Sequence, residues 1–175
     1  MIITIDGPSG SLKTTMANKL KNMGVRVLRA DDFFYPFGEK KHRLSGNFNA
    51  PFFIKNIMPK ILSGNAFDYL AFDCKTQKYY KKHAHASDVT VIEGSYSSTK
   101  LLDRYRDLSI FIKANQNACI KRIKRRVGAE RFKMFEERWI PDERRYFIKN
   151  RNYKNAVIIK YYSELEAIIK NLKIK

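Results

Sequence analysis

IITIDGPSGSLKTT, residues 2–15, places a short β-branched run directly before a turn rich in glycine and serine. The run Ile2–Asp6 has the composition of a buried strand, and the spacing of apolar residues after the turn predicts a helix over Lys13–Met23. Between them, residues 7–14 nearly match G-x-x-x-x-G-K-[ST], a motif that links a strand to a helix and surrounds phosphate with backbone N–H groups. This segment predicts an α/β fold that binds a phosphorylated ligand.

The phosphate-loop motif also predicts what its residues do. Lys13 should reach the β- and γ-phosphates, Thr14 should hold Mg²⁺, and the helix N-terminus adds positive potential. Leu12 departs from the motif, because it replaces a glycine at a point where backbone and phosphate approach closely. One alternative is therefore a loop that binds nucleotide weakly. The predicted nucleotide-binding residues of the loop are Gly7, Ser9, Gly10, Ser11, Leu12, Lys13, Thr14 and Thr15.

Along the rest of the chain, β-branched runs alternate with helical patterns, which predicts βαβ units, a parallel sheet and a single domain over residues 1–175. Further strands are predicted at Val25–Ala30, Val89–Glu93, Leu108–Lys113 and Ala156–Lys160. Further helices are predicted at Pro51–Leu62, Ser98–Tyr105, Asn115–Val127, Glu130–Arg138, Pro141–Lys149 and Ser163–Leu172. One insertion, at about residues 64–84, interrupts this alternation: Phe67–Phe72 and Gln77–Lys82 are typical of a β-hairpin.

Carboxylates follow three of the predicted strands at their carboxyl ends. They occur in the pairs Asp6-Gly7, Asp31-Asp32 and Glu93-Gly94. Open α/β sheets bind ligands at this edge. The pattern is therefore typical of a site that holds a metal ion and phosphate.

The second of these strand ends carries a family resemblance. Asp32, Phe34 and Tyr35 match a D-x-F-Y motif, and the chain resembles the uridine kinase family of P-loop kinases over roughly residues 2–160. The resemblance implies a three-layer P-loop NTPase fold, in which a five-stranded parallel sheet has helices on both faces, a small β-hairpin insertion and an arginine-rich lid helix. It also implies that Asp32 takes the proton of the acceptor hydroxyl and that Tyr35 contacts the acceptor. Asp32→Asn should then lower turnover by orders of magnitude and spare ATP affinity.

Two later segments resemble the family's acceptor pocket. The run Asn47–Pro51 is similar to the family's N-F-D-x-P segment, with Asn49 where the family has aspartate, and it puts Phe48 and Asn49 in the pocket. The hairpin adds Asp73, which is equally suited to a turn, and Gln77, which stands where the family presents histidine. Because glutamine both donates and accepts hydrogen bonds, a nucleobase remains compatible with this pocket.

Glu93 resembles the glutamate that follows the third strand in these kinases. A carboxylate at this point can orient Mg²⁺ within reach of Thr14. The resemblance therefore implies a catalytic set of Asp32, Lys13 and Glu93, with Thr14 and Glu93 as metal ligands and with ATP and Mg²⁺ as cofactors.

A basic helix is predicted in the region of about residues 118–138. It carries five Lys or Arg side chains within residues 121–126, among them Arg122 and Arg126 on one face. The family has an R-x-x-R-R lid here that closes over ATP, so Arg122 and Arg126 are predicted to bind nucleotide. A solvated basic face is the alternative interpretation of the same pattern.

The whole chain carries 35 Lys and Arg against 17 Asp and Glu, a net charge of +18, which favours an anionic partner. A basic nucleic-acid-binding module is an alternative function, although no aromatic residues are interleaved with the charges of residues 121–126. Two cysteines and the absence of a signal or spanning segment predict a cytoplasmic protein without a membrane role. The predicted partners are ATP and a small acceptor with a hydroxyl group, most simply a nucleoside such as uridine. A homo-oligomer remains open.

Overall fold

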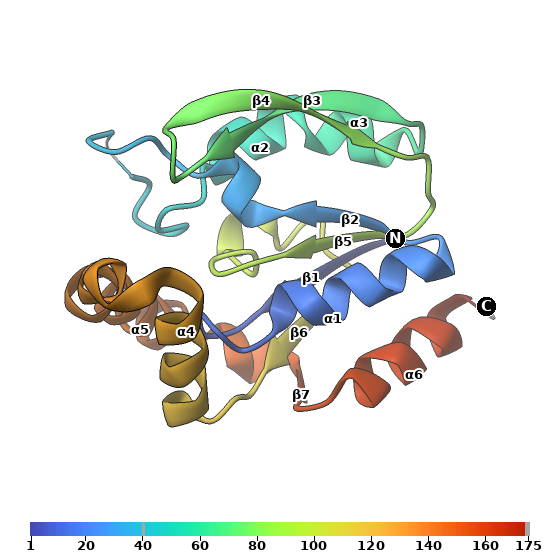
Figure 1. Ribbon diagram of the computed structural model, residues 1–175. Coiled ribbons are helices and arrows are strands. Elements are labelled where there is room, and N and C mark those ends of the chain that lie inside the picture. The colour runs from blue at the N-terminus through green and yellow to red at the C-terminus, as the bar shows by residue number, and fades with distance from the viewer. Residues whose placement is uncertain (40, 174–175) are drawn as a thin grey trace.

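A five-stranded parallel sheet forms the centre of the molecule (Figure 1). The computed structural model describes residues 1–39 and 41–173. Hydrogen bonds connect the strands in the order β2-β5-β1-β6-β7. The strands are β1 (Ile2–Asp6), β2 (Arg26–Arg29), β5 (Thr90–Glu93), β6 (Leu108–Ile112) and β7 (Val157–Ile159). Each lies within one residue of its predicted bounds, and the parallel α/β fold is confirmed.

The side chains of the strands alternate between two apolar clusters, one on each face of the sheet. Ile3 and Ile5 of β1 pack with α1 (Lys13–Leu20), which continues into η1 (Lys21–Met23), and with α6 (Tyr162–Lys173). The neighbouring Ile2 belongs to the cluster on the other face. That face is covered by α2 (Ala50–Asn56), α3 (Met58–Leu62), η3 (Lys100–Leu102) and α5 (Ile140–Asn150). The fold therefore has three layers, with helices on both faces of the sheet.

The predicted hairpin is present and lies beyond the β2 edge of the sheet (Figure 1). Its antiparallel strands are β3 (Phe67–Asp73) and β4 (Lys78–Ala84), and its turn falls one residue later than predicted. The hairpin packs on η2 (Ala30–Phe33), where the rings of Phe33 and Tyr69 stack with their centroids 5.2 Å apart. This packing fixes the chain that follows β2.

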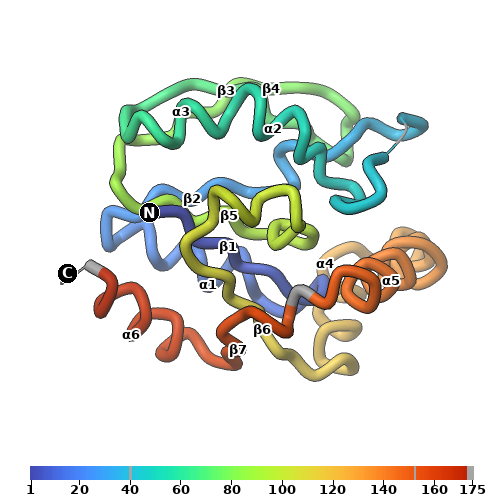
Figure 2. The backbone as a smooth tube through the Cα atoms, turned by 180° about the vertical axis from the view of Figure 1, so that it is seen from behind, coloured from blue at the N-terminus to red at the C-terminus, as the bar shows by residue number. Residues whose placement is uncertain are grey.

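A long helical segment crosses the carboxyl ends of the strands. It comprises α4 (Gln116–Met134), the π-helical turn η4 (Phe135–Trp139) and α5, with non-helical backbone at Gly128 near the predicted break. Seen from behind, α4 and α5 lie together at one end of the molecule, away from the N-terminus (Figure 2). The short η5 (Asn152–Asn155) then leads into β7. None of the helices in residues 1–39 and 41–173 has the length and apolar character that a membrane span requires.

Two helix predictions need correction. The segment predicted as a helix at Ser98–Tyr105 forms only η3. Its polar side chains form hydrogen bonds outside the segment: the Thr99 hydroxyl donates to the carbonyl of Leu44, and the Ser98 hydroxyl pairs with that of Ser109. The predicted helix Pro51–Leu62 is divided at Ile57, just before Pro59, whose ring nitrogen has no hydrogen to donate.

Candidate active site

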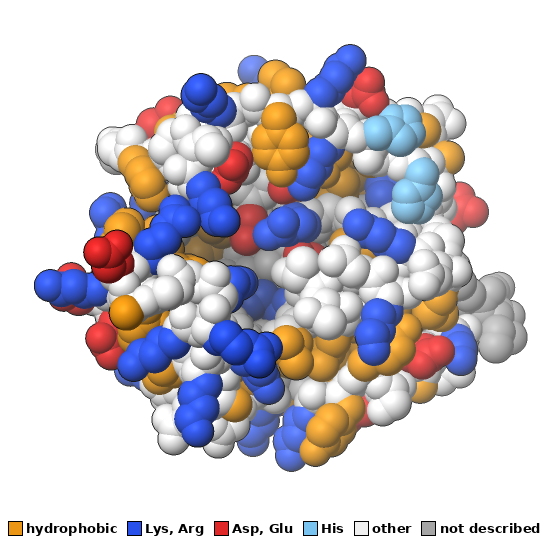
Figure 3. Space-filling model, in the orientation of Figure 1, with side chains coloured by type: hydrophobic (Ala, Val, Ile, Leu, Met, Phe, Trp, Pro, Cys, Tyr) orange, Lys and Arg blue, Asp and Glu red, His pale blue; other side chains and the backbone are white. Residues whose placement is uncertain are grey.

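A cavity of about 780 Å³ opens at the carboxyl ends of the strands. The phosphate loop (residues 7–14) forms one wall, η2 and the end of the hairpin form a second wall, and α4 and η4 form a third. Figure 3 shows the hollow, with Lys and Arg side chains along its border. The predicted site residues that line it are Ser9, Gly10, Ser11, Leu12, Lys13, Thr14, Thr15, Tyr35, Glu93, Arg122 and Arg126.

Close backbone contacts explain two glycines of the phosphate loop. At Gly7 a Cβ atom would lie 2.8 Å from the carbonyl oxygen of Ile112, and at Gly10 it would lie 2.6 Å from that of Cys119. Both glycines have positive φ, which side chains disfavour. The loop therefore packs directly against β6 and α4, and its predicted place between β1 and α1 is correct.

Leu12 adopts the conformation that a glycine would supply at this position. Its φ is 73° and its ψ is 17°, in the left-handed region, and its side chain is 42% exposed at the edge of the cavity. A leucine there costs roughly 1 kcal/mol of backbone strain. The loop nevertheless keeps the turn into α1, because the Met16 N–H donates to the carbonyl of Leu12 at 2.9 Å.

We expect Leu12→Gly to stabilise the folded protein by about 1 kcal/mol and to change the ATP dissociation constant by less than about threefold. The stability gain follows because glycine removes the strain, and the affinity is retained because the backbone already has the required conformation. Urea denaturation and titration calorimetry measure the two quantities. An affinity gain of tenfold or more on restoring glycine would instead identify the present loop as impaired.

Polar groups of the loop are arranged to receive an anion. The Lys13 ammonium donates to the carbonyls of Gly7 and Pro8 at 2.7 and 2.8 Å. The Ser11 hydroxyl is buried and has no hydrogen-bond partner among the described residues. Arg122 of α4 donates to the carbonyl of Gly10 at 2.9 Å, which brings a guanidinium to the loop. A phosphate would provide acceptors for these donors, so the loop fits the group that its sequence predicts.

A chain of charged and polar contacts lies beside the loop. The Thr14 hydroxyl donates to Glu93 at 3.2 Å, and Arg29 lies 3.5 Å from Glu93 and 3.3 Å from Asp31. Burial, and to a lesser extent the charge of Asp31, raise the pKa of Glu93 to about 7, although Lys13 and Arg29 oppose the shift. Since the described residues contain no cluster of three His, Cys, Asp or Glu side chains able to hold a metal, Mg²⁺ would need phosphate oxygens besides Thr14 and Glu93.

The buried carboxyls predict how stability depends on pH in the absence of nucleotide. Burial raises the pKa of Glu93 from 4.5 to about 7 and that of Asp6 from 3.8 to about 6. Between these values the folded state holds protons that the unfolded state has lost, so rising pH favours unfolding. We expect the free energy of unfolding to fall from about pH 4 to pH 7, by up to about 1.4 kcal/mol per pH unit for each group.

Urea denaturation of the protein and of Glu93→Gln, in the presence of EDTA, measures this dependence. In the variant the fall between pH 6 and pH 7 should become much smaller, because only the Asp6 contribution remains. Parallel profiles for the two proteins over this interval would contradict the assignment to Glu93.

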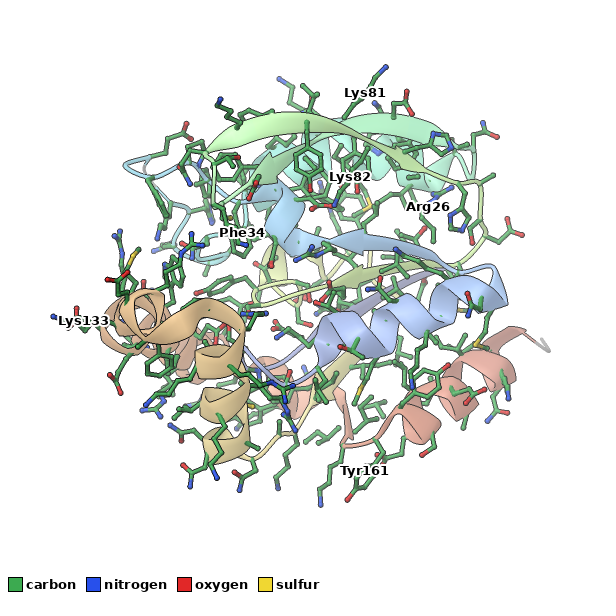
Figure 4. All side chains as sticks on the ribbon, viewed as in Figure 1. Arg26, Phe34, Lys81, Lys82, Lys133 and Tyr161 are labelled. Atoms are coloured by element: carbon green, nitrogen blue, oxygen red, sulfur yellow. The ribbon has the colours of Figure 1, made fainter. Side chains whose placement is uncertain are left out.

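The structure separates the two aspartates that follow β2. Asp32, predicted as the base, does not line the cavity: its side chain is 3% exposed, bonds to Lys82 at 2.8 Å and accepts a hydrogen bond from the Tyr69 hydroxyl at 3.0 Å. Figure 4 shows Lys82 beneath the hairpin. Asp31 does line the cavity, and its side chain is 44% exposed. Because η2 is a 3₁₀ turn, consecutive side chains point in different directions, and the carboxylate that faces the phosphate loop belongs to Asp31.

Four residues predicted for the acceptor pocket also lie outside the cavity. Phe48 is fully buried in the core, and Asn49 caps α2 by accepting a hydrogen bond from Phe52. Asp73 accepts bonds from Lys75 and Thr76 in the hairpin turn, and the Gln77 amide donates to the Cys74 carbonyl within the same turn. In this structure Phe48 stabilises the core, Asn49 and Asp73 stabilise a helix end and a turn, and Gln77 also accepts a hydrogen bond from the Phe37 N–H at 3.0 Å.

Other residues that form the site were not predicted. Glu143 of α5 lines the cavity and accepts hydrogen bonds from the backbone and hydroxyl of Ser9, at 2.9 and 2.6 Å, and from the Ser95 hydroxyl. It lies 134 residues from Ser9 in the chain, and no sequence spacing connects the two. The further lining residues include aromatic rings, which are Phe34, Phe37, Phe72, Tyr96, Phe135 and Trp139. Their separation in the sequence gave no periodic signal.

Comparison with solved structures places this fold among known ones. A protein from Bacillus stearothermophilus, described as a possible uridine kinase, has a TM-score of 0.68 and 20% identity, covering 91% of this chain and 88% of its own. A protein from Silicibacter sp. TM1040, provisionally described as a fructose transport system kinase, has a TM-score of 0.61 and 17% identity, covering 91% and 87%. An uncharacterised protein from Eubacterium ventriosum has a TM-score of 0.55 and 16% identity, covering 100% and 99%.

No family model and no curated protein matches the sequence. At these identities, the structural similarities define the fold and not the substrate. They extend over at least 91% of this chain, so it shares the fold of these structures, two of which are described as kinases.

Proposed function

We propose that the protein transfers the γ-phosphoryl group of ATP to a hydroxyl group of a small molecule. One observation carries this proposal: the phosphate loop with Lys13, the Thr14–Glu93 pair and the carboxylate of Asp31 line the same cavity. Phosphoryl transfer depends mainly on positioning and charge neutralisation, and these groups suit both tasks.

The phosphate loop and α4 form the side of the cavity that would bind ATP, the phosphoryl donor. The loop N–H groups and Lys13 would bind the β- and γ-phosphates, and Arg122 and Arg126, which both line the cavity, would stabilise charge on the transferring group. Mg²⁺ would neutralise further phosphate charge, held by Thr14 and Glu93. The buried Ser11 hydroxyl, which lacks a partner among the described residues, supports this use of the loop.

The acceptor side is the end of β2 and η2. Asp31 takes the role that the sequence predicted for Asp32, because its carboxylate reaches the cavity. It would accept the proton of the acceptor hydroxyl while that oxygen bonds to the γ-phosphorus and the bond from phosphorus to the ADP oxygen breaks. Arg29, at 3.3 Å, holds the carboxylate in place. Uridine and other nucleosides are the first acceptors to test, on the strength of the motif resemblance.

An ADP-release assay with ATP, Mg²⁺ and a panel of nucleosides and sugars tests the proposal. We expect Lys13→Met to lower kcat/KM by at least about 100-fold, because the lysine charge acts on the transferring phosphate. Lys78→Met, an exposed lysine on β4 that does not line the cavity, serves as the control and should leave the rate unchanged. Absence of ATP binding to the protein and to its Leu12→Gly form would overturn the proposed function.

A further inference from the structure

A second, smaller cavity of about 330 Å³ adjoins the active-site cavity. Lys41, Asn47 and Tyr96 line both, so the two spaces share a wall. One side of the small cavity is the loop of residues 41–47, and the other is α5. Both tube and ribbon views show this loop and α5 at the same end of the molecule (Figures 1 and 2). We call this space the annex.

Positive side chains dominate the lining of the annex. It receives Lys41 and Arg43 from the loop and Arg145 and Lys149 from α5, against a single carboxylate, Asp142, which accepts a hydrogen bond from Arg145. Among the described residues, no carboxylate lies within ion-pair distance of Lys41, Arg43 or Lys149. Burial, together with the charge of Arg138, lowers the pKa of Lys41. The annex therefore has an unbalanced positive field in a concave site, which is the condition for binding an anion.

The aromatic side chain of Tyr96 lines both the annex and the main cavity. Tyr96 has a φ of 75°, a left-handed conformation that a bulky residue rarely adopts. Its ring contacts Tyr146 edge-on at 4.8 Å, and a Cβ at Gly46 would lie 2.5 Å from that ring. Strain of this kind is kept where the surrounding packing requires one particular geometry. Here the Tyr96 ring lies between Gly46 of the loop and Tyr146 of α5.

The position of the annex separates it from the nucleotide phosphates. No residue of the phosphate loop, and none of the lid arginines Arg122, Arg125 and Arg126, lines it. Two of the three residues that it shares with the main cavity, Lys41 and Asn47, belong to the loop that follows η2, and η2 carries Asp31. An anion in the annex would therefore belong to the acceptor and not to the triphosphate of ATP.

We infer that the acceptor carries an anionic group, a phosphate or a carboxylate, that binds in the annex while its hydroxyl group lies at Asp31. This inference rests on the proposed function and narrows its substrate class to phosphorylated or carboxylated alcohols, in place of neutral nucleosides. A nucleoside such as uridine has no group that would use Lys41, Arg43 and Lys149. A phosphorylated sugar or a hydroxy acid does.

A binding experiment tests the annex without catalysis. The protein is saturated with a non-hydrolysable ATP analogue and Mg²⁺, so that the phosphate loop is filled, and inorganic phosphate or acetate is titrated at constant ionic strength with chloride as the reference. The Arg43→Gln/Lys149→Gln variant removes one annex cation from each wall. The control, Lys78→Gln/Lys100→Gln, removes two exposed cations that line neither cavity.

We expect one of the two anions to raise the melting temperature of the protein and of the control above the chloride reference, and the annex variant to lose this shift. Whichever anion acts identifies phosphate or carboxylate as the preferred group. Equal melting temperatures in phosphate, acetate and chloride, or equal shifts in the annex variant, would overturn the inference and leave the proposed kinase activity standing.

A kinetic experiment tests whether the protein prefers anionic acceptors to neutral ones. Matched pairs are compared by ADP release: fructose with fructose 6-phosphate, and pantothenol with pantothenate. For the favoured charged member we expect the annex variant to raise KM by about tenfold or more, with kcat nearly unchanged, because charge-assisted hydrogen bonds to a remote anion contribute binding. Faster turnover of the neutral members would overturn the inference. Failure to bind any ATP analogue would instead overturn the proposed function.

Discussion

Asp31→Asn should lower kcat at least about 100-fold and leave the dissociation constant of ATP unchanged, because general-base catalysis contributes roughly 10²–10⁴ in rate. Asparagine keeps the size of the side chain but cannot take a proton from the acceptor hydroxyl. The affinity for ATP should persist, since Asp31 lies after β2 whereas the phosphates would be held by residues 7–14. Steady-state ADP release and titration calorimetry on the same preparation measure both quantities.

Asp32→Asn is the matched control for this result, because it makes the same chemical change one residue away. Asp32 is buried against Lys82 and Tyr69, so its loss leaves an ammonium without its carboxylate and should destabilise the fold by about 3 kcal/mol. At a temperature where the variant stays folded, its kcat should fall less than about tenfold, since on the proposed mechanism the proton passes to Asp31 and Asp32 does not line the cavity. If Asp32→Asn instead lowered kcat more than Asp31→Asn while keeping full stability, Asp32 would be the general base.

Arg26→Met should lower the free energy of unfolding by about 3 kcal/mol, because buried acceptors left without a donor cost about 1–3 kcal/mol each. Arg26 is fully buried, and its guanidinium donates to the carbonyls of Gly64 and Asn65 at 2.8 Å and of His85 at 2.7 Å. These carbonyls belong to the chain that enters and leaves the hairpin. Figure 4 shows Arg26 between the hairpin and β2.

Urea denaturation measures the effect, with Lys100→Met as an exposed control that should change stability by less than about 0.5 kcal/mol. Because Arg26 tethers the hairpin, amide hydrogen exchange in β3 and β4 should accelerate more than exchange in β1. Unchanged stability in Arg26→Met would show that the free energy of desolvating the guanidinium cancels the stabilisation from its hydrogen bonds.

The sequence contained most of the information on the sheet. Strands covered on both faces are continuous apolar runs, and their alternation with helical patterns admits few topologies, so the five strands of the parallel sheet could be placed within one residue. The phosphate loop was also readable, because backbone geometry in a tight strand-to-helix turn restricts which residues fit. Gly7 and Gly10 illustrate this restriction through their contacts with β6 and α4.

The side chains that face the acceptor side of the cavity could not be predicted from the sequence in this way. Whether Asp31 or Asp32 faces the cavity depends on the rotation of one 3₁₀ turn, which the hairpin fixes through the contacts of Lys82 and Tyr69 with Asp32. Phe48 matches the family motif and Asn49 stands in place of its aspartate, yet packing and helix capping occupy their side chains. Motif resemblance constrains residue type and spacing, but not the direction of a side chain.

Sequence alone therefore determined the parallel α/β sheet, the phosphate loop and the basic helix that crosses it, because these depend on local periodicity and backbone geometry. Only the tertiary structure decided which carboxylate reaches the cavity, that Glu143 joins α5 to Ser9, and that Lys41 and Lys149 face the same annex. Such contacts join residues up to 134 positions apart. They depend on how the packed core orients each helix and strand, and a local sequence pattern does not predict this orientation.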